Sequence, residues 1–221
     1  MGDIEATFIR NSFALRINPG KRLKFGKILG DNWSRITERL DALEVTNFSM
    51  WEADNIVFGY FESAESHEAW DSQDKSFFHS LSEKFEGCFS WISTPWVNMQ
   101  LMYEDFGIVR RSKELIRHRV FITELVPGAE QEYKARHDGL AQAKKEITKG
   151  PDSNFSIWSA GGYVFGYDEI DTTMEHEKTE VDKQAEIAWE TKMLEIMKWI
   201  TDDVDWITGE HHTHIRRLCY H

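Results

Sequence analysis

The side chains best suited to chemistry in this sequence are Tyr133, Arg136 and His137, near the start of a segment over residues 131–146 whose pattern predicts a helix. At helical pitch Tyr133 and His137 are four residues apart and share one face, with Arg136 beside them. Imidazole has the ordinary pKa nearest neutrality, and a phenol and a guanidinium can hydrogen bond to sugar hydroxyls. The group would suit acid–base chemistry on a sugar. The alternative is a structural cluster on a surface helix.

A second copy of this segment, without these groups, lies in the first half of the chain. Three blocks recur 107 or 108 residues later: 13–20 as 121–128, 47–51 as 154–158, and 57–60 as 164–167. The change of one residue in the spacing is what a single loop insertion produces. The pattern predicts a tandem duplication, with repeats over residues 8–107 and 117–221 joined by a polar linker at residues 105–117.

Each copy has the pattern of a strand, a helix, a hairpin of two strands, a second helix and a last strand. In the first copy these elements are expected at residues 13–18, 21–43, 47–52, 55–62, 66–85 and 97–103. In the second copy they are expected at residues 120–126, 129–148, 154–160, 163–169, 174–199 and 215–220. The order β-α-β-β-α-β predicts an α+β fold of two ferredoxin-like repeats.

Helices cover only one face of a ferredoxin-like sheet, and the other face of each repeat would expose alternate aromatic and aliphatic side chains. Packing the two sheets face to face would hide both of these surfaces. We therefore expect an intramolecular dimeric α/β-barrel, which is a monomer with an internal pseudo-dimer or a homodimer of such chains.

Composition excludes several classes of partner. The chain has 221 residues, 41% of them hydrophobic, and a formal net charge of −12, which argues against nucleic acid or an anionic membrane as partner. Its two cysteines, Cys88 and Cys219, fall in different repeats and form no CxxC pair, as expected in a reducing compartment. Because no signal-like or 18-residue apolar run is present, we expect a cytoplasmic protein.

The second repeat resembles the L-rhamnose mutarotase family, small ferredoxin-like proteins that normally associate as dimers. The resemblance covers about residues 119–220 and is carried by Phe121, Pro127, Tyr133-x-x-Arg136-His137, residues 154–158 and residues 164–166. It implies a catalytic histidine at His137 and a sugar-binding tyrosine at Tyr133. It implies no cofactor and no metal.

The family also has an aromatic residue in the second strand and a tandem Trp pair on the second helix. The first falls at Phe155, where tyrosine is frequent in the family, and the pair is reduced to Trp189 followed by Glu190. Both departures bear on which sugar is bound. We expect Trp158 and Trp189 to stack on the sugar, and Arg136 to donate to its hydroxyls or to pair with a surface carboxylate.

The first repeat lacks the reactive groups. Tyr133 corresponds to Phe25, and His137 corresponds to Leu29. The tryptophan of the second helix is replaced by a residue near Ser82. The first repeat is therefore predicted to be non-catalytic, retained to cover the sheet and to line a pocket.

Mutarotation, the activity that the resemblance implies, interconverts the α and β anomers of a reducing sugar through the open aldehyde. A base removes the proton of the anomeric hydroxyl while an acid protonates the ring oxygen, and one imidazole can serve in both directions. We therefore expect an isomerase that acts on L-rhamnose or on a related 6-deoxy or neutral hexose.

Three other interpretations stay open. The chain could be a non-catalytic or differently specific sugar-binding relative. It could instead be a haem-binding or cofactor-free oxygenase of the dimeric α/β-barrel type, with His137 as a haem ligand. His211, His212 and His214 could bind a metal, although no Cys or carboxylate stands at a familiar spacing around them. His214 could instead start the last strand and point inward.

Overall fold

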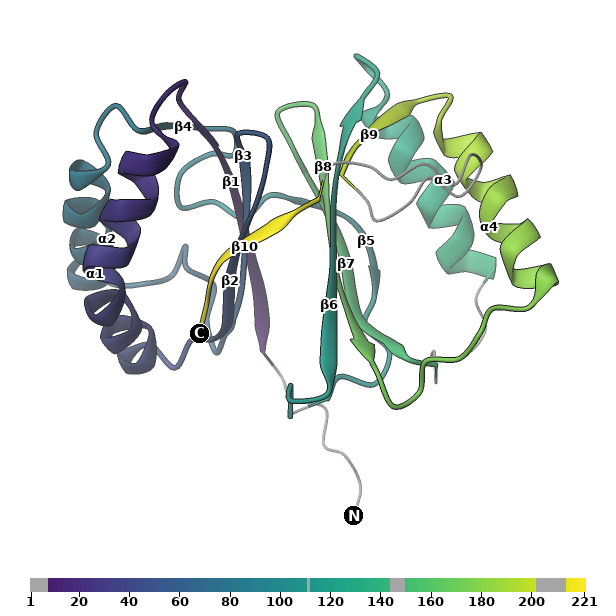
Figure 1. The fold of residues 1–221 in the computed structure, drawn as a ribbon, viewed down its shortest axis with the longest axis horizontal. Helices are drawn as coiled ribbons and strands as arrows, with labels where there is room; N and C mark the ends of the chain where they lie inside the picture. The colour runs from purple at the N-terminus through teal and green to yellow at the C-terminus, as the bar shows by residue number, and fades with distance from the viewer. Residues whose placement is uncertain (1–7, 111, 144–149, 202–213) are drawn as a thin grey trace. The chain divides into compact units, whose positions relative to one another are not determined.

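The computed structural model describes residues 8–110, 112–143, 150–201 and 214–221. These residues form two five-stranded antiparallel sheets, each with two helices (Figure 1), so the predicted α+β fold of two ferredoxin-like repeats is confirmed. The chain divides into two compact units. The first-repeat unit holds the described residues up to Met99 together with Arg216–His221, and the second-repeat unit runs from Gln100 to Ile215. The face-to-face packing of the two sheets stays a prediction.

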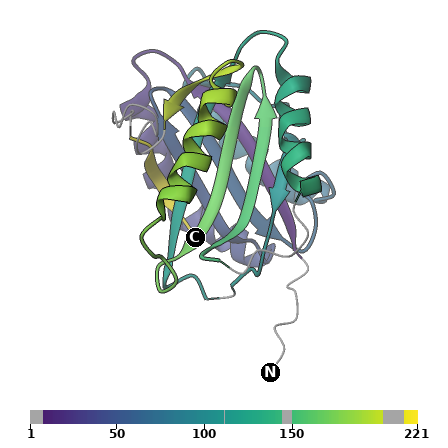
Figure 2. The same cartoon turned by 90° about the vertical axis from the view of Figure 1, so that its right-hand side faces the viewer.

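The elements of the first repeat follow the predicted order. They are β1 (Ile9–Ile17), α1 (Arg22–Ala42), β2 (Thr46–Ala53), β3 (Ile56–Ser63), α2 (Ser72–Lys84) and β4 (Phe89–Trp91). The second repeat has β6 (Ile116–Leu125), α3 (Glu130–Ala143), β7 (Asp152–Ala160), β8 (Tyr163–Asp171), α4 (Glu180–Met193) and β9 (Met197–Thr201). Two further strands are β5 (Gln100–Asp105) and β10 (Arg216–Tyr220). Figure 2 shows α3 and α4 lying across the same face of the second-repeat sheet.

The last strand of each copy joins the sheet of the other repeat, contrary to the prediction. The strand orders are β10-β2-β3-β1-β4 and β5-β7-β8-β6-β9. Thus β5 pairs with β7, and β10, yellow in Figure 1, pairs with β2. Repeat boundaries in the sequence therefore do not coincide with the compact units.

A short strand that was not predicted follows the second helix of each repeat and pairs within the same repeat. It is β4 in the first repeat and β9 in the second. The first residues of β9 fall inside the helix expected over residues 174–199. Met197 lies four residues after Met193, so the apolar spacing fits a continued helix as well as a new strand. Pairing with β6 decides for the strand, since Met197 lies opposite Leu125 and Trp199 opposite Thr123.

Both second helices begin later than predicted because an N-cap fixes their start. The Asp71 carboxylate accepts hydrogen bonds from the backbone amides of Gln73 and Asp74, each at 2.8 Å. Thr179 and Asp182 form a reciprocal capping box at the start of α4. Such caps satisfy backbone amides that have no partner inside the helix.

A phenylalanine ring lies across a strand glycine at the same place in both sheets. Phe13 is paired with Gly59, and Phe121 with Gly166. A Cβ atom on either glycine would overlap the phenylalanine ring, which explains why glycine stands at this position of the Val-Phe-Gly-Tyr block in both copies. Because Phe121 belongs to the core beneath α3 and α4, the glycine lets the sheet and its helices pack closely.

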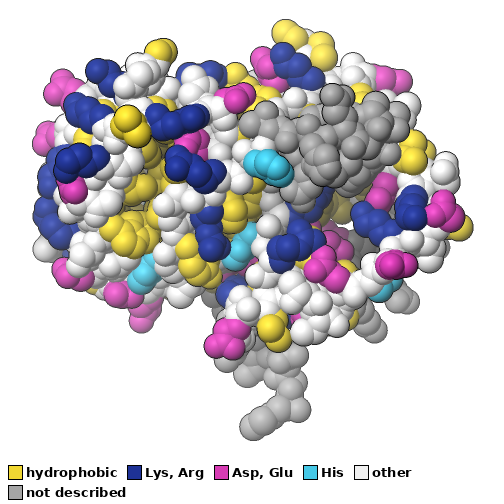
Figure 3. All heavy atoms as spheres, in the orientation of Figure 1, with side chains coloured by type: hydrophobic (Ala, Val, Ile, Leu, Met, Phe, Trp, Pro, Cys, Tyr) yellow, Lys and Arg dark blue, Asp and Glu magenta, His cyan; other side chains and the backbone are white. Residues whose placement is uncertain are grey.

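Three further observations concern the surface, the helices and the cysteines of the described residues. Figure 3 shows apolar side chains between lysine and arginine side chains on the first-repeat part of the face it draws. No helix within the described ranges is long and apolar enough to span a bilayer. Cys88 and Cys219 are both free thiols.

Gly166→Ala should destabilise the protein, because the new methyl group forces the Phe121 ring out of place. Overpacking of this kind costs about 1–3 kcal/mol. The matched control is Gly139→Ala within α3, where an added Cβ meets nothing within 4 Å, so the free energy of unfolding should rise by about 0.4–1 kcal/mol. Urea unfolding of both variants measures this. Equal stability of the two variants would contradict the close approach of Phe121 to Gly166.

Candidate functional site

The second-repeat unit has a cavity of about 160 Å³ between its two helices and its sheet. Four of the predicted site residues line it: Tyr133, His137, Phe155 and Trp189. The remaining lining residues are Tyr103, Arg119, Phe121, Leu140, Ile157, Glu190, Met193, Met197 and Trp199. The structure therefore brings the central pair, Tyr133 and His137, into one cavity with two of the aromatic residues expected beside it.

A hydrogen bond to the main chain fixes the protonation of the His137 ring. Its Nδ1 lies 3.0 Å from the backbone carbonyl oxygen of Tyr133, one helical turn earlier. A carbonyl can only accept, so Nδ1 must carry the proton in the neutral ring. Nε2 then holds a lone pair, and no hydrogen bond joins it to another residue in the described part of the chain. The imidazole is therefore prepared to act as a base through Nε2.

Burial lowers the pKa of His137 below its ordinary value of 6.5. Desolvation of the imidazolium is the largest cause, and the carbonyl of Tyr133 and the carboxylate of Asp138 oppose it. The side chain is buried, with 5% of the residue exposed. The ring is consequently neutral at neutral pH, which is the form that a general base requires.

Aromatic rings hold this imidazole in place. The Tyr133 ring stacks on it with centroids 4.3 Å apart and an interplanar angle of 27°. Trp189 presents a perpendicular ring at 5.1 Å, and Tyr103 a tilted ring at 5.4 Å. Contacts from α3, α4 and β5 thus restrict the orientation of the ring that carries Nε2.

Tyr133 is suited to donate a hydrogen bond and not to lose its proton. Burial raises the pKa of its phenol well above the ordinary value of 10.0, while the positive charge of Arg119 opposes this shift. The hydroxyl makes no hydrogen bond to a described residue. It is therefore a protonated donor at the wall of the cavity.

Sequence reasoning missed two charged side chains of the cavity. Glu190 is 1% exposed, and its Oε1 accepts a hydrogen bond of 2.5 Å from Nε1 of Trp199. In the sequence it stood only as a departure from a tryptophan pair, although a carboxylate next to Trp189 on a core-facing helix was a usable signal. Arg119 lies two residues before Phe121 on β6, and strand alternation places both on the helix-covered face.

Tyr103 could not have been assigned to this site from the repeat boundaries. It belongs to β5, which lies within the predicted first repeat but pairs with β7 of the second. Its ring lies 5.6 Å from that of Phe155, and burial raises its pKa. The strand exchange therefore supplies one aromatic wall of the cavity.

Two predicted binding residues lie outside the cavity. Arg136 pairs with Glu132 at 2.7 Å and Glu195 at 3.1 Å, and it donates to the carbonyl of Lys192 near the end of α4. This corresponds to the surface pairing that was the alternative for Arg136, and it ties the two helices together.

Trp158 follows Ile157 on β7, so its side chain points to the opposite face of the sheet from the cavity. Its Nε1 donates to Oγ of Ser156 at 3.0 Å. His214 is exposed and precedes β10, so the expected inward position at the strand start is wrong. His211 and His212 lie outside the described residues.

Comparison with known proteins supports the sequence resemblance. The model of the L-rhamnose mutarotase family matches residues 118–216. No curated protein matches the chain.

Two similar solved structures have low sequence identity. One is a protein of Fusobacterium nucleatum described as a monooxygenase, 10% identical, covering 97% of this chain and 91% of its own, with a TM-score of 0.46. The other is an anthrone oxidase-like protein, 11% identical, covering 96% and 97%, with a TM-score of 0.44.

The family match falls on the repeat that holds His137, Tyr133 and the cavity between α3 and α4. The resemblance of the second repeat to the L-rhamnose mutarotase family is therefore confirmed over residues 118–216.

Proposed function

We propose that the second repeat is a sugar mutarotase that interconverts the anomers of L-rhamnose or a related 6-deoxy or neutral hexose, with His137 as the catalytic base. The observation that carries this proposal is the hydrogen bond from His137 Nδ1 to the Tyr133 carbonyl. It leaves the Nε2 lone pair as the proton acceptor of a buried, neutral imidazole at the wall of a cavity.

The size and lining of the cavity favour a small neutral sugar. Its volume of about 160 Å³ is below the roughly 300–1,000 Å³ of pockets for drug-sized ligands, and well below what a haem would need. The rings of Trp189, Phe155 and Tyr103 offer apolar faces for the sugar ring and for the methyl group of a 6-deoxy sugar. Arg119 and the Tyr133 hydroxyl can hydrogen bond to its hydroxyls.

The proposed reaction needs two proton transfers. Nε2 of His137 accepts the proton of the anomeric hydroxyl as the bond between C1 and the ring oxygen breaks, and the ring oxygen takes a proton from the Glu190 carboxyl. This gives the open aldehyde with an imidazolium and a carboxylate. After rotation about the C1–C2 bond, the ring closes on the other aldehyde face. The imidazolium then protonates the carbonyl oxygen, and Glu190 recovers its proton from the attacking hydroxyl.

Tyr133 has a separate role in this scheme. Its raised pKa keeps the phenol protonated, so it holds a sugar oxygen by donating a hydrogen bond. Trp199 in turn orients the Glu190 carboxyl through the indole N–H. Acid–base catalysis contributes typically 10²–10⁴-fold per group, which suffices for a reaction that already proceeds in water.

The same proposal covers assembly and location. The two repeats would form an internal pseudo-dimer, alone or as a homodimer, in place of the dimer of single-repeat relatives. A reducing, cytoplasmic location is supported by the free thiols of Cys88 and Cys219.

His137→Leu should lower the rate of anomer exchange by a hundredfold or more, because leucine cannot move a proton. Leucine is the residue at the equivalent position of the first repeat, Leu29. Saturation-transfer NMR between the anomeric protons of L-rhamnose measures the rate. The control is Leu29→Ala, which should lower stability by about 2–5 kcal/mol and leave the exchange rate unchanged.

The pH profile tests the same group. A lowered pKa keeps the imidazole unprotonated at neutral pH, so the wild-type rate should hold down to the ordinary value of 6.5 and fall only at lower pH. An equal rate in wild type and His137→Leu, or a loss of rate that begins above pH 6.5, would contradict the assignment of His137 as the base.

Tyr133→Phe should slow exchange only about three- to tenfold, since it removes one uncharged hydrogen bond worth about 0.5–1.5 kcal/mol. The ring and its stacking on His137 remain, so the stability should change little. A loss of a hundredfold or more, measured by the same NMR exchange experiment, would show that Tyr133 transfers a proton itself. No change at any pH would remove the hydroxyl from the site.

Glu190→Gln should slow exchange by about a hundredfold, because the amide keeps the hydrogen bond from Trp199 but cannot deliver a proton. The matched control is Glu195→Gln at the exposed partner of Arg136, which should leave the rate unchanged. If both glutamine variants retain the wild-type rate, Glu190 is not the acid of this reaction.

A further inference from the structure

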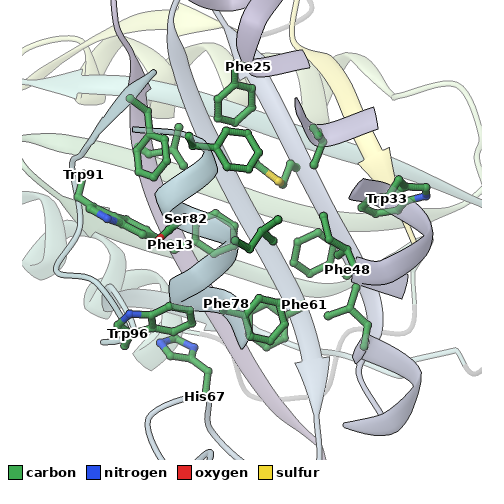
Figure 4. Close-up of a pocket in the computed structure, with 18 of the residues that line it drawn as sticks. Phe13, Phe25, Trp33, Phe48, Phe61, His67, Phe78, Ser82, Trp91 and Trp96 are labelled. Atoms are coloured by element: carbon green, nitrogen blue, oxygen red, sulfur yellow. The ribbon is translucent and has the colours of Figure 1, made fainter. Parts of the chain in front are cut away.

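The first-repeat unit has a cavity of about 150 Å³ between α1, α2 and its own sheet, drawn in Figure 4. Aromatic side chains dominate its walls, and Figure 4 shows that they come from both helices, the strands and the loops around α2. They are Phe13, Phe25, Trp33, Phe48, Phe61, Trp70, Phe78, Phe85, Phe89, Trp91 and Trp96. Leu15, Leu29, Ile36, Leu40, Met50, His67, Leu81 and Ser82 complete the lining.

This cavity is the counterpart of the one in the second repeat. Strand pairing fixes the correspondence, because Leu15 lies opposite Trp91 in the first sheet and Thr123 opposite Trp199 in the second, each 108 residues later. The position of the base is Leu29, which removes the proton-transfer group from the first-repeat cavity.

The other polar residues of the second-repeat cavity also have less polar counterparts in the first repeat. At that spacing Tyr133 is matched by Phe25, Trp189 by Leu81, and Glu190 by Ser82. The phenol, the indole and the carboxylate of the sugar-type cavity are thus replaced by apolar or small side chains. The two repeats therefore share the space, but its lining is more apolar in the first repeat.

An apolar cavity of this size is unusual within the core of a protein domain. Side chains in cores interdigitate and leave few voids larger than a water molecule, because atoms lining a void lose packing contacts. A cavity of 150 Å³ lined by apolar side chains stays dry and binds benzene in another protein. The first-repeat cavity therefore has the size and lining for one aromatic ring.

His67 gives the cavity one specific polar group. It is 4% exposed, and its Nδ1 has no hydrogen-bond partner within the described residues. Its ring packs beside those of Phe61, at 5.8 Å, and Trp70, at 6.2 Å. Burial lowers the pKa of His67 to about 4, with Glu68 opposing the shift, so the ring is neutral at neutral pH. A buried ring nitrogen without a partner is costly, and a ligand that hydrogen bonds to it removes that cost.

We propose that the first-repeat cavity binds a small uncharged aromatic molecule with a single polar group, of the phenol type, whose hydroxyl hydrogen bonds to Nδ1 of His67. A sugar is excluded because its several hydroxyls would find too few partners among these side chains. A charged ligand is excluded because no side chain of opposite charge lines the cavity. The inference is independent of the mutarotase proposal, since no lining residue is shared.

Isothermal titration of the full-length protein with phenol and with toluene tests this proposal. We expect one phenol molecule per chain, and phenol should bind about three- to tenfold more tightly than toluene because of the hydrogen bond to His67. His67→Phe should abolish this preference for phenol while toluene still binds.

Two cavity-filling variants locate the site. Ser82→Phe and Leu29→Phe each place a ring in the cavity and should weaken phenol binding at least tenfold. The matched control is Ser80→Phe on the exposed side of α2, which adds the same atoms outside the cavity and should bind phenol as wild type does. Thermal unfolding of each variant shows that it is folded.

Two results would overturn the proposal: no saturable binding of either probe to wild type, or full binding by both Ser82→Phe and Leu29→Phe. An unchanged preference for phenol in His67→Phe would overturn the assignment of His67. L-rhamnose should bind equally to wild type and to Ser82→Phe, because any site for it lies in the second repeat. Binding of L-rhamnose that is lost in Ser82→Phe would show a sugar site in the first repeat and would also overturn the proposal.

Discussion

The packing of two helices against one face of a five-stranded sheet is the constraint on which the rest of each unit depends. Phe121 lies across Gly166 in the second sheet, and Phe13 lies across Gly59 in the first. Both phenylalanine rings line the cavity between the sheet and the helices of their unit. Each repeat encloses a cavity at this interface, so the binding space is a property of the fold, and its chemistry is decided by a few side chains.

In the second repeat those side chains work through the backbone of α3. The backbone carbonyl of Tyr133 accepts a hydrogen bond from Nδ1–H of His137 one turn later, an arrangement that the helix supplies without any additional residue. Stacked and perpendicular rings then hold the imidazole, and burial keeps it neutral. A neutral imidazole with a lone pair on Nε2 is thereby obtained from a short run of sequence and a hydrophobic environment.

The two repeats show how a duplicated site can diverge while its scaffold stays intact. The first repeat has Leu29 in place of His137 and Ser82 in place of Glu190, so it lacks both ionisable side chains but keeps a cavity of nearly equal volume. Apolar side chains fit the same backbone because the helix and strand positions face the core in either case. The interior can therefore change its ligand class with little change in the fold.

The sequence by itself determined the duplication, the α+β class and the helix that carries Tyr133 and His137, because periodicity and repeated blocks are local signals. It also indicated Phe155 and Trp189 through the family resemblance. Only the tertiary structure decided that β5 and β10 exchange sheets, that Tyr103 reaches the site of the second repeat, and that Glu190 and Arg119 line it. It also placed Trp158 on the opposite face and Arg136 on the surface. The physical reason is that strand partners are chosen by contacts between distant segments, and neither the spacing nor the type of a residue records which segment will lie beside it.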